Sequence, residues 1–82
     1  MDLSQPSWFA DLGSWWVPAV GPEVAGNVRP LGLDAHGALH VACSSRAWEE
    51  QVTLLKEPIT VRLNAALGAH AVSSVLVDLR NG

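Results

Sequence analysis

Four tryptophans and five basic side chains are the residues of this sequence best suited to chemistry with another molecule. Indole rings can stack on the bases of single-stranded nucleic acid, and lysine and arginine can contact its phosphates. The candidate phosphate contacts are Arg29, Arg46, Lys56, Arg62 and Arg80. Arg46 is the strongest of them, because it falls at the start of a predicted helix, where backbone N–H groups also favour anions.

The tryptophans divide into two groups by position. Trp16 and Trp48 lie on the periodic apolar faces of predicted helices, which favours burial in the core. Trp15 and Trp16 are adjacent, so their side chains diverge by about 100° on a helix, and we expect only one of them to be fully buried. Trp8 and Trp15, together with Leu76 of the last predicted strand, are therefore the candidate partner surface.

The remaining reactive side chains form no recognisable catalytic or metal-binding set. The three histidines show no ligand spacing with one another or with the single cysteine, Cys43, so no metal site is expected. No serine or histidine fits a nucleophile–base arrangement, and there is no phosphate-binding P-loop. We therefore expect a binding protein that is not an enzyme and holds no cofactor.

The composition favours one domain over residues 1–82 with its own core, because 49% of the 82 residues are hydrophobic. No apolar run approaches the roughly 20 residues that a membrane span needs, so no membrane partner is expected. The polar, acidic start MDLSQPS is unlike a secretory signal. A lone cysteine fits a reducing compartment, and we expect a cytoplasmic protein.

The net charge of −3 bears on the choice of partner. Isolated nucleic-acid-binding domains are commonly basic. We expect any binding of single-stranded DNA by this domain to be weak and strongly dependent on salt. The charge favours a protein partner or a basic segment outside this sequence, and it leaves self-association open.

These side chains must be positioned by a small set of elements. Apolar spacing predicts a helix over residues 7–16, with Ser7 as its N-cap and a kink or end at Pro18. A short helical turn follows from Pro22 to Ala25. The predicted hairpin pairs residues 28–33 with residues 38–44, and Pro30 confines the first of these strands to an edge or a bulge.

A long apolar periodicity then runs from Trp48 through Leu55 to Ala66 and passes Pro58 in phase. It predicts one kinked helix or two nearly collinear ones, capped by Ser44 or Ser45 at the start and by Gly68 at the end. The last predicted strand covers residues 72–80. The predicted fold class is α+β: helix, β-hairpin, kinked helix and strand, with the helices on one face of a three-stranded sheet.

The ordered set of motifs resembles the DciA family of bacterial replicative-helicase loaders over nearly the whole chain. The matching segments are WVPAVG at 16–21, GALHV at 37–41, SSRAW at 44–48 and LNAALG at 63–68. The resemblance implies a DNA replication initiation factor whose KH-like N-terminal domain binds the DnaB-type helicase. It also implies that the protein assists helicase loading on single-stranded DNA without catalysis of its own.

Two features depart from the pattern that this resemblance implies. A KH domain proper clamps the nucleic-acid backbone with a G-x-x-G loop, and this sequence has none. Family members commonly carry a basic extension, whereas this sequence ends at Asn81-Gly82. Either such a segment lies outside the sequence or the compact domain works alone. The alternative function is a stand-alone KH-like module that binds single-stranded nucleic acid.

Overall fold

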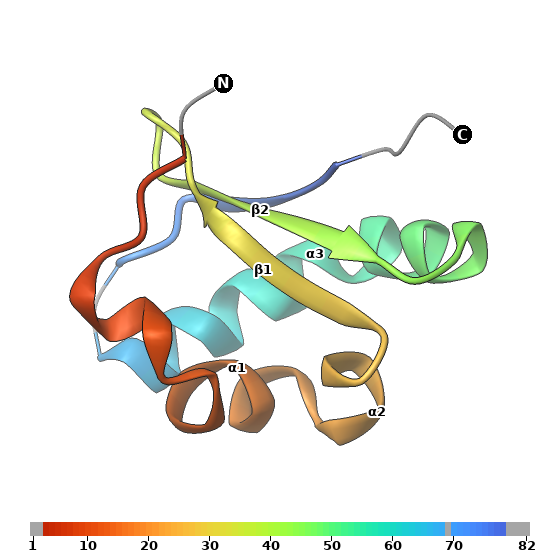
Figure 1. The fold of residues 1–82 in the computed structure, drawn as a ribbon, viewed down its shortest axis with the longest axis horizontal. Coiled ribbons are helices and arrows are strands. Elements are labelled where there is room, and N and C mark those ends of the chain that lie inside the picture. Colours follow the sequence, from red (N-terminus) through yellow and green to blue (C-terminus); the bar gives the residue numbers. More distant parts are fainter. Residues whose placement is uncertain (1–2, 69, 79–82) are drawn as a thin grey trace.

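The computed structural model describes residues 3–68 and 70–78, and its architecture is α+β, as the sequence predicts. Figure 1 shows the helices lying against one face of the sheet. In chain order the elements are a 3-10 helix η1 (Ser7–Ala10), α1 (Leu12–Val20), α2 (Pro22–Ala25), β1 (Val28–Leu33), β2 (Ala38–Cys43), α3 (Arg46–Leu67) and β3 (Ser74–Val77). The observed strand β3 starts two residues later than the predicted strand over residues 72–80 and ends at Val77. Residues 79 and 80 of the predicted strand lie outside the described residues.

The sheet has the order β1-β2-β3 and is mixed. β1 and β2 form the predicted antiparallel hairpin, whereas β3 returns after α3 and pairs with β2 in parallel. The register of the hairpin shifts between Pro30 and Gly32, so the proline lies on an edge strand beside a bulge, as predicted. The parallel pairing follows from the helical crossover, because a parallel neighbour cannot be reached by a tight turn.

The central strand β2 has all six residues buried. Its alternation sends Leu39, Val41 and Cys43 into the core beneath the helices. The opposite side of the sheet carries His40 between two alanines, and we call it the open face. No helix of the described residues covers this face (Figure 1).

The prediction of a continuous helix over residues 7–16 is wrong. The chain forms the short η1 turn, breaks at Asp11 and then starts α1. Pro6, and not Ser7, stands at the N-cap of η1. Pro18 lies within α1, which continues to Val20. Of the two predicted alternatives, an end of the helix at the proline is therefore excluded.

This break explains a second wrong prediction, the exposure of Trp15. The side chain of Trp15 is only 1% exposed, and that of Trp16 is 2% exposed. Because η1 folds back after the break at Asp11, Trp8 and Phe9 pack against the Trp15 ring with centroid distances of 5.0 and 5.3 Å. The two adjacent indoles can therefore both be buried, since η1 covers one of them and the sheet covers the other.

Each buried indole N–H also has a partner. Trp15 donates to the carbonyl oxygen of Phe9 at 3.1 Å, and Trp16 donates to that of Val28 at 3.0 Å. These bonds remove the cost of burying an unpaired donor. They tie α1 to η1 on one side and to β1 on the other.

The long helix α3 is continuous through Pro58. The Ser45 side chain accepts a hydrogen bond from the backbone N–H of Trp48, which decides between the two predicted caps. Gly68 ends the helix in the left-handed conformation at φ 75°, as predicted. Leu55, predicted to face the core, is 38% exposed, because the core contacts of α3 centre on Val52, Ile59 and Leu63.

Candidate partner-binding surfaces

The predicted basic residues do not converge on one site. Arg29 lies on β1, where its pairing with Ala42 places it on the open face of the sheet, and it is exposed. Arg46, Lys56 and Arg62 are exposed on α3. Their spacings of ten and six residues turn them to different sides of the helix. Arg80 lies outside the described residues.

Acidic side chains accompany the basic ones along α3. Arg46 shares a surface hollow with Glu49 and Glu50, and Lys56 lines another together with Glu57. Phosphate binding gains from several cations acting together. Over the described part of α3, the alternation of charge weakens the case for a phosphate-binding surface.

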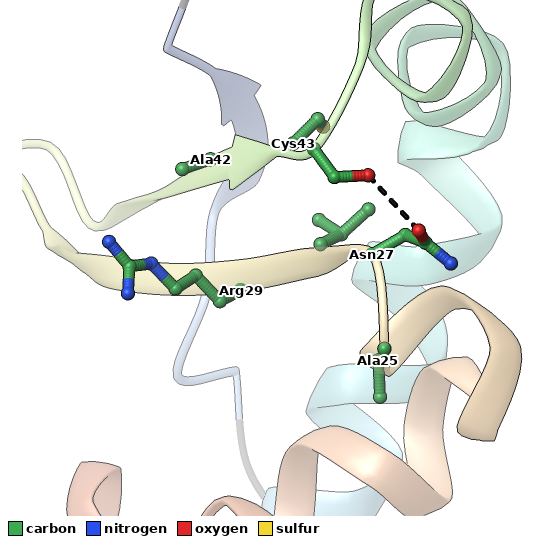
Figure 2. A pocket seen from close by; sticks show the side chains of 8 residues that line it. Ala25, Asn27, Arg29, Ala42 and Cys43 are labelled. Carbon is green, nitrogen blue, oxygen red and sulfur yellow. Dashed lines mark hydrogen bonds between the residues drawn. The ribbon is translucent and has the colours of Figure 1, made fainter.

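Figure 2 shows the pocket at the start of β1, where Arg29 extends beside Ala42. The Ser44 hydroxyl donates to the side-chain oxygen of Asn27 at 3.0 Å and closes one end of the pocket. Arg29 is the one charged residue lining it. A single guanidinium at a shallow pocket can contact an anion, but it does not select one.

The predicted partner surface is also divided by the fold. Trp8 is half-buried and packs against the core, and Trp15 lies inside it. Leu76 is 41% exposed on β3, where it pairs with His40 on the open face. The structure therefore does not bring these three side chains together on one surface.

A polar cluster on the open face was not predicted. His40 is buried, and its two ring nitrogens meet two carboxylates. Nε2 lies 2.9 Å from Oδ2 of Asp34, and Nδ1 lies 2.6 Å from Oδ1 of Asp78. The other oxygen of Asp34 accepts the backbone N–H groups of His36 and Ala38 at 2.8 and 3.0 Å. The cluster thus links the ends of β1 and β3 across β2.

The charges of this cluster reinforce one another. The hydrogen bond to Asp34 raises the pKa of His40 above 6.5; burial opposes this shift, and Asp78 adds to it. The hydrogen bond to His40 lowers the pKa of Asp34 to about 2, with a further contribution from the N–H of Ala38. Because both ring nitrogens of His40 are hydrogen-bonded to carboxylates, neither is free for general base catalysis or for metal binding.

Cys43 is the one cysteine of the chain, and it is buried. Burial raises the pKa of the Cys43 thiol, and the charge of Glu49 adds to this, so the thiol is not activated as a nucleophile. Among residues 3–68 and 70–78, no group of three His, Cys, Asp or Glu side chains could hold a metal ion. No helix in the described ranges combines the length and apolar composition needed to cross a bilayer.

The most exposed large apolar side chains among the described residues were also not predicted as a surface. Leu54 is 79% exposed and Val61 is 69% exposed, both on α3. Their spacing of seven residues places them on one side of the helix, out of phase with the core residues. That phase difference was readable in the sequence. The core periodicity is the stronger signal, because it runs the length of the helix.

Comparison with known proteins identifies the family. The sequence model described as "Dna[CI] antecedent, DciA" matches residues 1–77. This chain belongs to the DciA family. The chain is similar to a UPF0232 protein of Rhodococcus jostii, with 34% identity over 62 residues that cover 76% of this chain and 32% of the relative.

Further DciA-type relatives come from mycobacteria. A UPF0232 protein of Mycolicibacterium paratuberculosis is 32% identical over 66 residues, which cover 80% of this chain and 35% of the relative. One of Mycobacterium tuberculosis is 31% identical over 62 residues, which cover 76% and 33%. The chain spans about a third of the length of these relatives. No solved structure gives a significant match.

Proposed function

We propose that this chain is the helicase-binding domain of a cytoplasmic DNA replication initiation factor, and that it assists the loading of a DnaB-type helicase on single-stranded DNA. Membership in the DciA family over residues 1–77 carries the proposal. The mixed sheet with helices on one face is compatible with the KH-like shape that the resemblance implies. The whole of residues 1–82 acts as one domain in this proposal.

The adaptor works through binding energy alone. The helicase ring exchanges between conformations that admit a DNA strand and conformations that do not. A protein shifts that exchange only by binding one conformation more tightly than the other. To raise the population of the admitting conformation from one per cent to 99 per cent, the adaptor must bind it roughly 10⁴-fold more tightly than the other conformation. Several domains acting on one ring can divide this requirement among them.

The absence of catalysis is supported by the state of the reactive side chains. His40 uses both nitrogens in hydrogen bonds to carboxylates, and the pKa of the Cys43 thiol is raised by burial. In this proposal the helicase, and not this domain, supplies the chemical energy for unwinding. The adaptor contributes a surface, and its effect depends on the stoichiometry and affinity of the complex.

Direct contact with single-stranded DNA is a minor part of the proposal. The exposed cations of the described residues are dispersed, and two of them stand beside carboxylates. We expect DNA affinity to fall steeply between low and physiological salt. A titration with a labelled oligonucleotide tests this, and tight binding of the isolated domain at physiological salt would instead support the stand-alone nucleic-acid-binding function.

The test of the proposed function is light scattering after size exclusion, with the full-length gene product and the helicase of the same organism. The expected result is a complex whose mass exceeds that of the helicase ring. A run without the helicase measures self-association at the same concentrations. Elution of the two proteins as separate species, at micromolar concentration of both, would contradict the proposal.

A further inference from the structure

The outward side of α3 carries a row of exposed apolar residues. It consists of Leu54, Pro58 and Val61, all of them exposed. Residues at these spacings follow one side of a helix. The opposite side of the same helix already packs its own apolar residues, including Val52 and Leu63, into the core.

An apolar residue on the solvent side adds nothing to the stability of this domain. A helix on a protein surface normally has one apolar stripe and a polar opposite side. α3 has two opposed apolar sides, and the outer one carries Leu54 and Val61, which are 79% and 69% exposed. A contiguous exposed apolar row is a candidate contact surface.

Charge repeats together with the apolar residues. Glu50 precedes Leu54 by four positions, and Glu57 precedes Val61 by four, so the same pair occurs twice, seven residues apart. Both glutamates are exposed, and no salt bridge involves either of them in the described residues. They border the row on one side, where Arg46 at the start of the helix lies beside Glu50 and leaves Glu57 as the charge without a basic neighbour four residues before it. Arg62 lies on the other side of the row.

Pro58 adds a hydrogen-bond acceptor to the row. Its nitrogen carries no hydrogen, so the carbonyl oxygen of Leu54 lacks the donor that position 58 would otherwise supply. An unpaired carbonyl is favourable only where water or another donor reaches it. The exposed side of α3 allows this, and a donor from a bound partner can take the place of water.

We propose that Leu54, Pro58 and Val61 form the surface on which the helicase binds, and that the bound element is an amphipathic helix with basic residues along one border. Apolar side chains of that helix, about 10.5 Å apart at a seven-residue spacing, cover Leu54 and Val61. Its lysines or arginines face Glu50 and Glu57, and polar or acidic residues face Arg62. This inference rests on the proposed function above.

The surface provides separate sources of affinity and specificity. Apolar contact at Leu54 and Val61 supplies most of the binding energy, as in other grooves and faces that receive an amphipathic helix. The glutamate border selects the orientation of the partner helix and speeds the encounter, because exposed charges act mainly on specificity and on the association rate. Leu54 and Val61 each line a surface hollow that could receive a side chain of the partner helix.

The test compares variants of the full-length protein in an affinity titration with the cognate helicase. Leu54→Ser combined with Val61→Ser is expected to weaken binding at least tenfold, which corresponds to about 1.4 kcal/mol. Val17→Ser, which changes an apolar residue 37% exposed on α1, is the matched control and is expected to bind within twofold of the wild type. Circular dichroism melts establish that each variant is folded.

A charge variant tests the surface independently. Glu57→Lys is expected to weaken binding severalfold at low salt and less at high salt, while Glu23→Lys on α2 is its matched control. Leu76→Ser examines the open face of the sheet as the rival surface. Loss of binding in Leu76→Ser, with binding retained in the Leu54/Val61 variant, would overturn the proposal.

The outcomes separate the two levels of inference. If the wild type binds the helicase and the Leu54/Val61 and Glu57 variants bind equally well, the surface is wrong and the proposed function stands. If the wild type does not bind the helicase, both are wrong. If the Leu54/Val61 variant loses only self-association in light scattering, the row is occupied by a second copy, and the partner-helix proposal is overturned.

Discussion

The two faces of the sheet are held by different physical means. The face beneath the helices buries Trp16, Leu39 and Val41 in a continuous apolar core. The open face has small residues, a histidine between two carboxylates, and the close approach of the N-terminal segment at Gly32. Hydrophobic burial dominates the first face, whereas local geometry and hydrogen bonding dominate the second. Substitutions on the two faces should therefore differ in size and in their dependence on pH.

The largest expected effect is on the covered face. Trp16→Ala removes a side chain that is 2% exposed and leaves the carbonyl of Val28 without its donor. We expect the free energy of unfolding to fall by about 3–5 kcal/mol, which is much of the stability of a small domain. Urea denaturation followed by circular dichroism measures it.

The matched control for this change is Leu54→Ala on the outer side of α3. That side chain is 79% exposed, so the expected change is within about 0.5 kcal/mol. Equal destabilisation by the two substitutions would show that the division between buried and exposed apolar residues is wrong.

On the open face, Gly32→Ala is expected to cost about 1–3 kcal/mol by overpacking. A Cβ at Gly32 would lie 2.8 Å from the Cβ of Leu3 and 2.9 Å from the carbonyl oxygen of Ser4. Ser4 pairs with Leu33, and the two residues exchange two backbone hydrogen bonds of 2.8 and 2.9 Å. Urea midpoints measure the loss, and faster proteolysis near Ser4 reports release of the segment.

Gly13→Ala is the matched control. A Cβ there would approach nothing closer than 3.7 Å, to a side-chain oxygen of Asp11, and Gly13 lies within α1. Alanine should stabilise the helix by up to roughly 1 kcal/mol. Opposite signs for the two glycine substitutions are the expected result, and two losses of equal size would contradict it.

A smaller effect is expected at the start of α3, in the layer that covers the sheet. Ser45→Ala removes the acceptor for the N–H of Trp48 at 3.3 Å and should cost about 1 kcal/mol. Ser44→Ala removes only the exposed bond to Asn27 and should cost less. Chemical denaturation of both variants compares them, and a larger loss at Ser44 would contradict the assignment of the cap.

The smallest expected effect is the pH dependence of the open face. The pKa of His40 is raised in the folded state, so its contribution to stability is complete below about 6.5 and is lost as the pH rises through the folded pKa. The pKa of Asp34 is lowered from 3.8 to about 2, so its contribution is present above 3.8 and is lost as the pH falls toward 2. Urea midpoints between pH 2 and 9 measure both limbs.

His40→Gln should remove the alkaline limb of this profile, because glutamine does not titrate. Asp78→Asn should reduce it, since one of the two carboxylates that stabilise the imidazolium is neutralised. An unchanged slope above pH 6.5 in His40→Gln would mean that the cluster does not couple protonation to folding.

Most of the backbone could be predicted from the sequence because local signals agreed with the fold. The alternation of β2, the Ser45 cap and Gly68 each depend on neighbouring residues. The prediction of one helix over residues 7–16 was wrong, because apolar residues at the spacing of Trp8, Leu12 and Trp15 can also be placed by two short helices that are separated at Asp11. Whether Trp15 is buried depends on the folding back of η1, which no local pattern specifies.

The candidate surfaces were harder to predict for a related reason. The contact of His40 with Asp78 depends on the register of β3 against β2, and that register is set by the crossover through α3. Trp8 and Trp15 were predicted as part of a partner surface, but packing decides the exposure of a side chain more than its residue type does. The positions of Leu54 and Val61 on the outer side of α3 could be predicted from the helical periodicity, but the extent of their exposure could not.

The most direct test of this account is hydroxyl-radical footprinting of the full-length protein, alone and in complex with the cognate helicase. The account predicts strong labelling of Leu54 and Val61 in the free protein, in line with their exposure of 79% and 69%, and marked protection of both in the complex. Labelling of Val17 should be unchanged. A stable complex in which Leu54 and Val61 remain fully labelled would contradict the account.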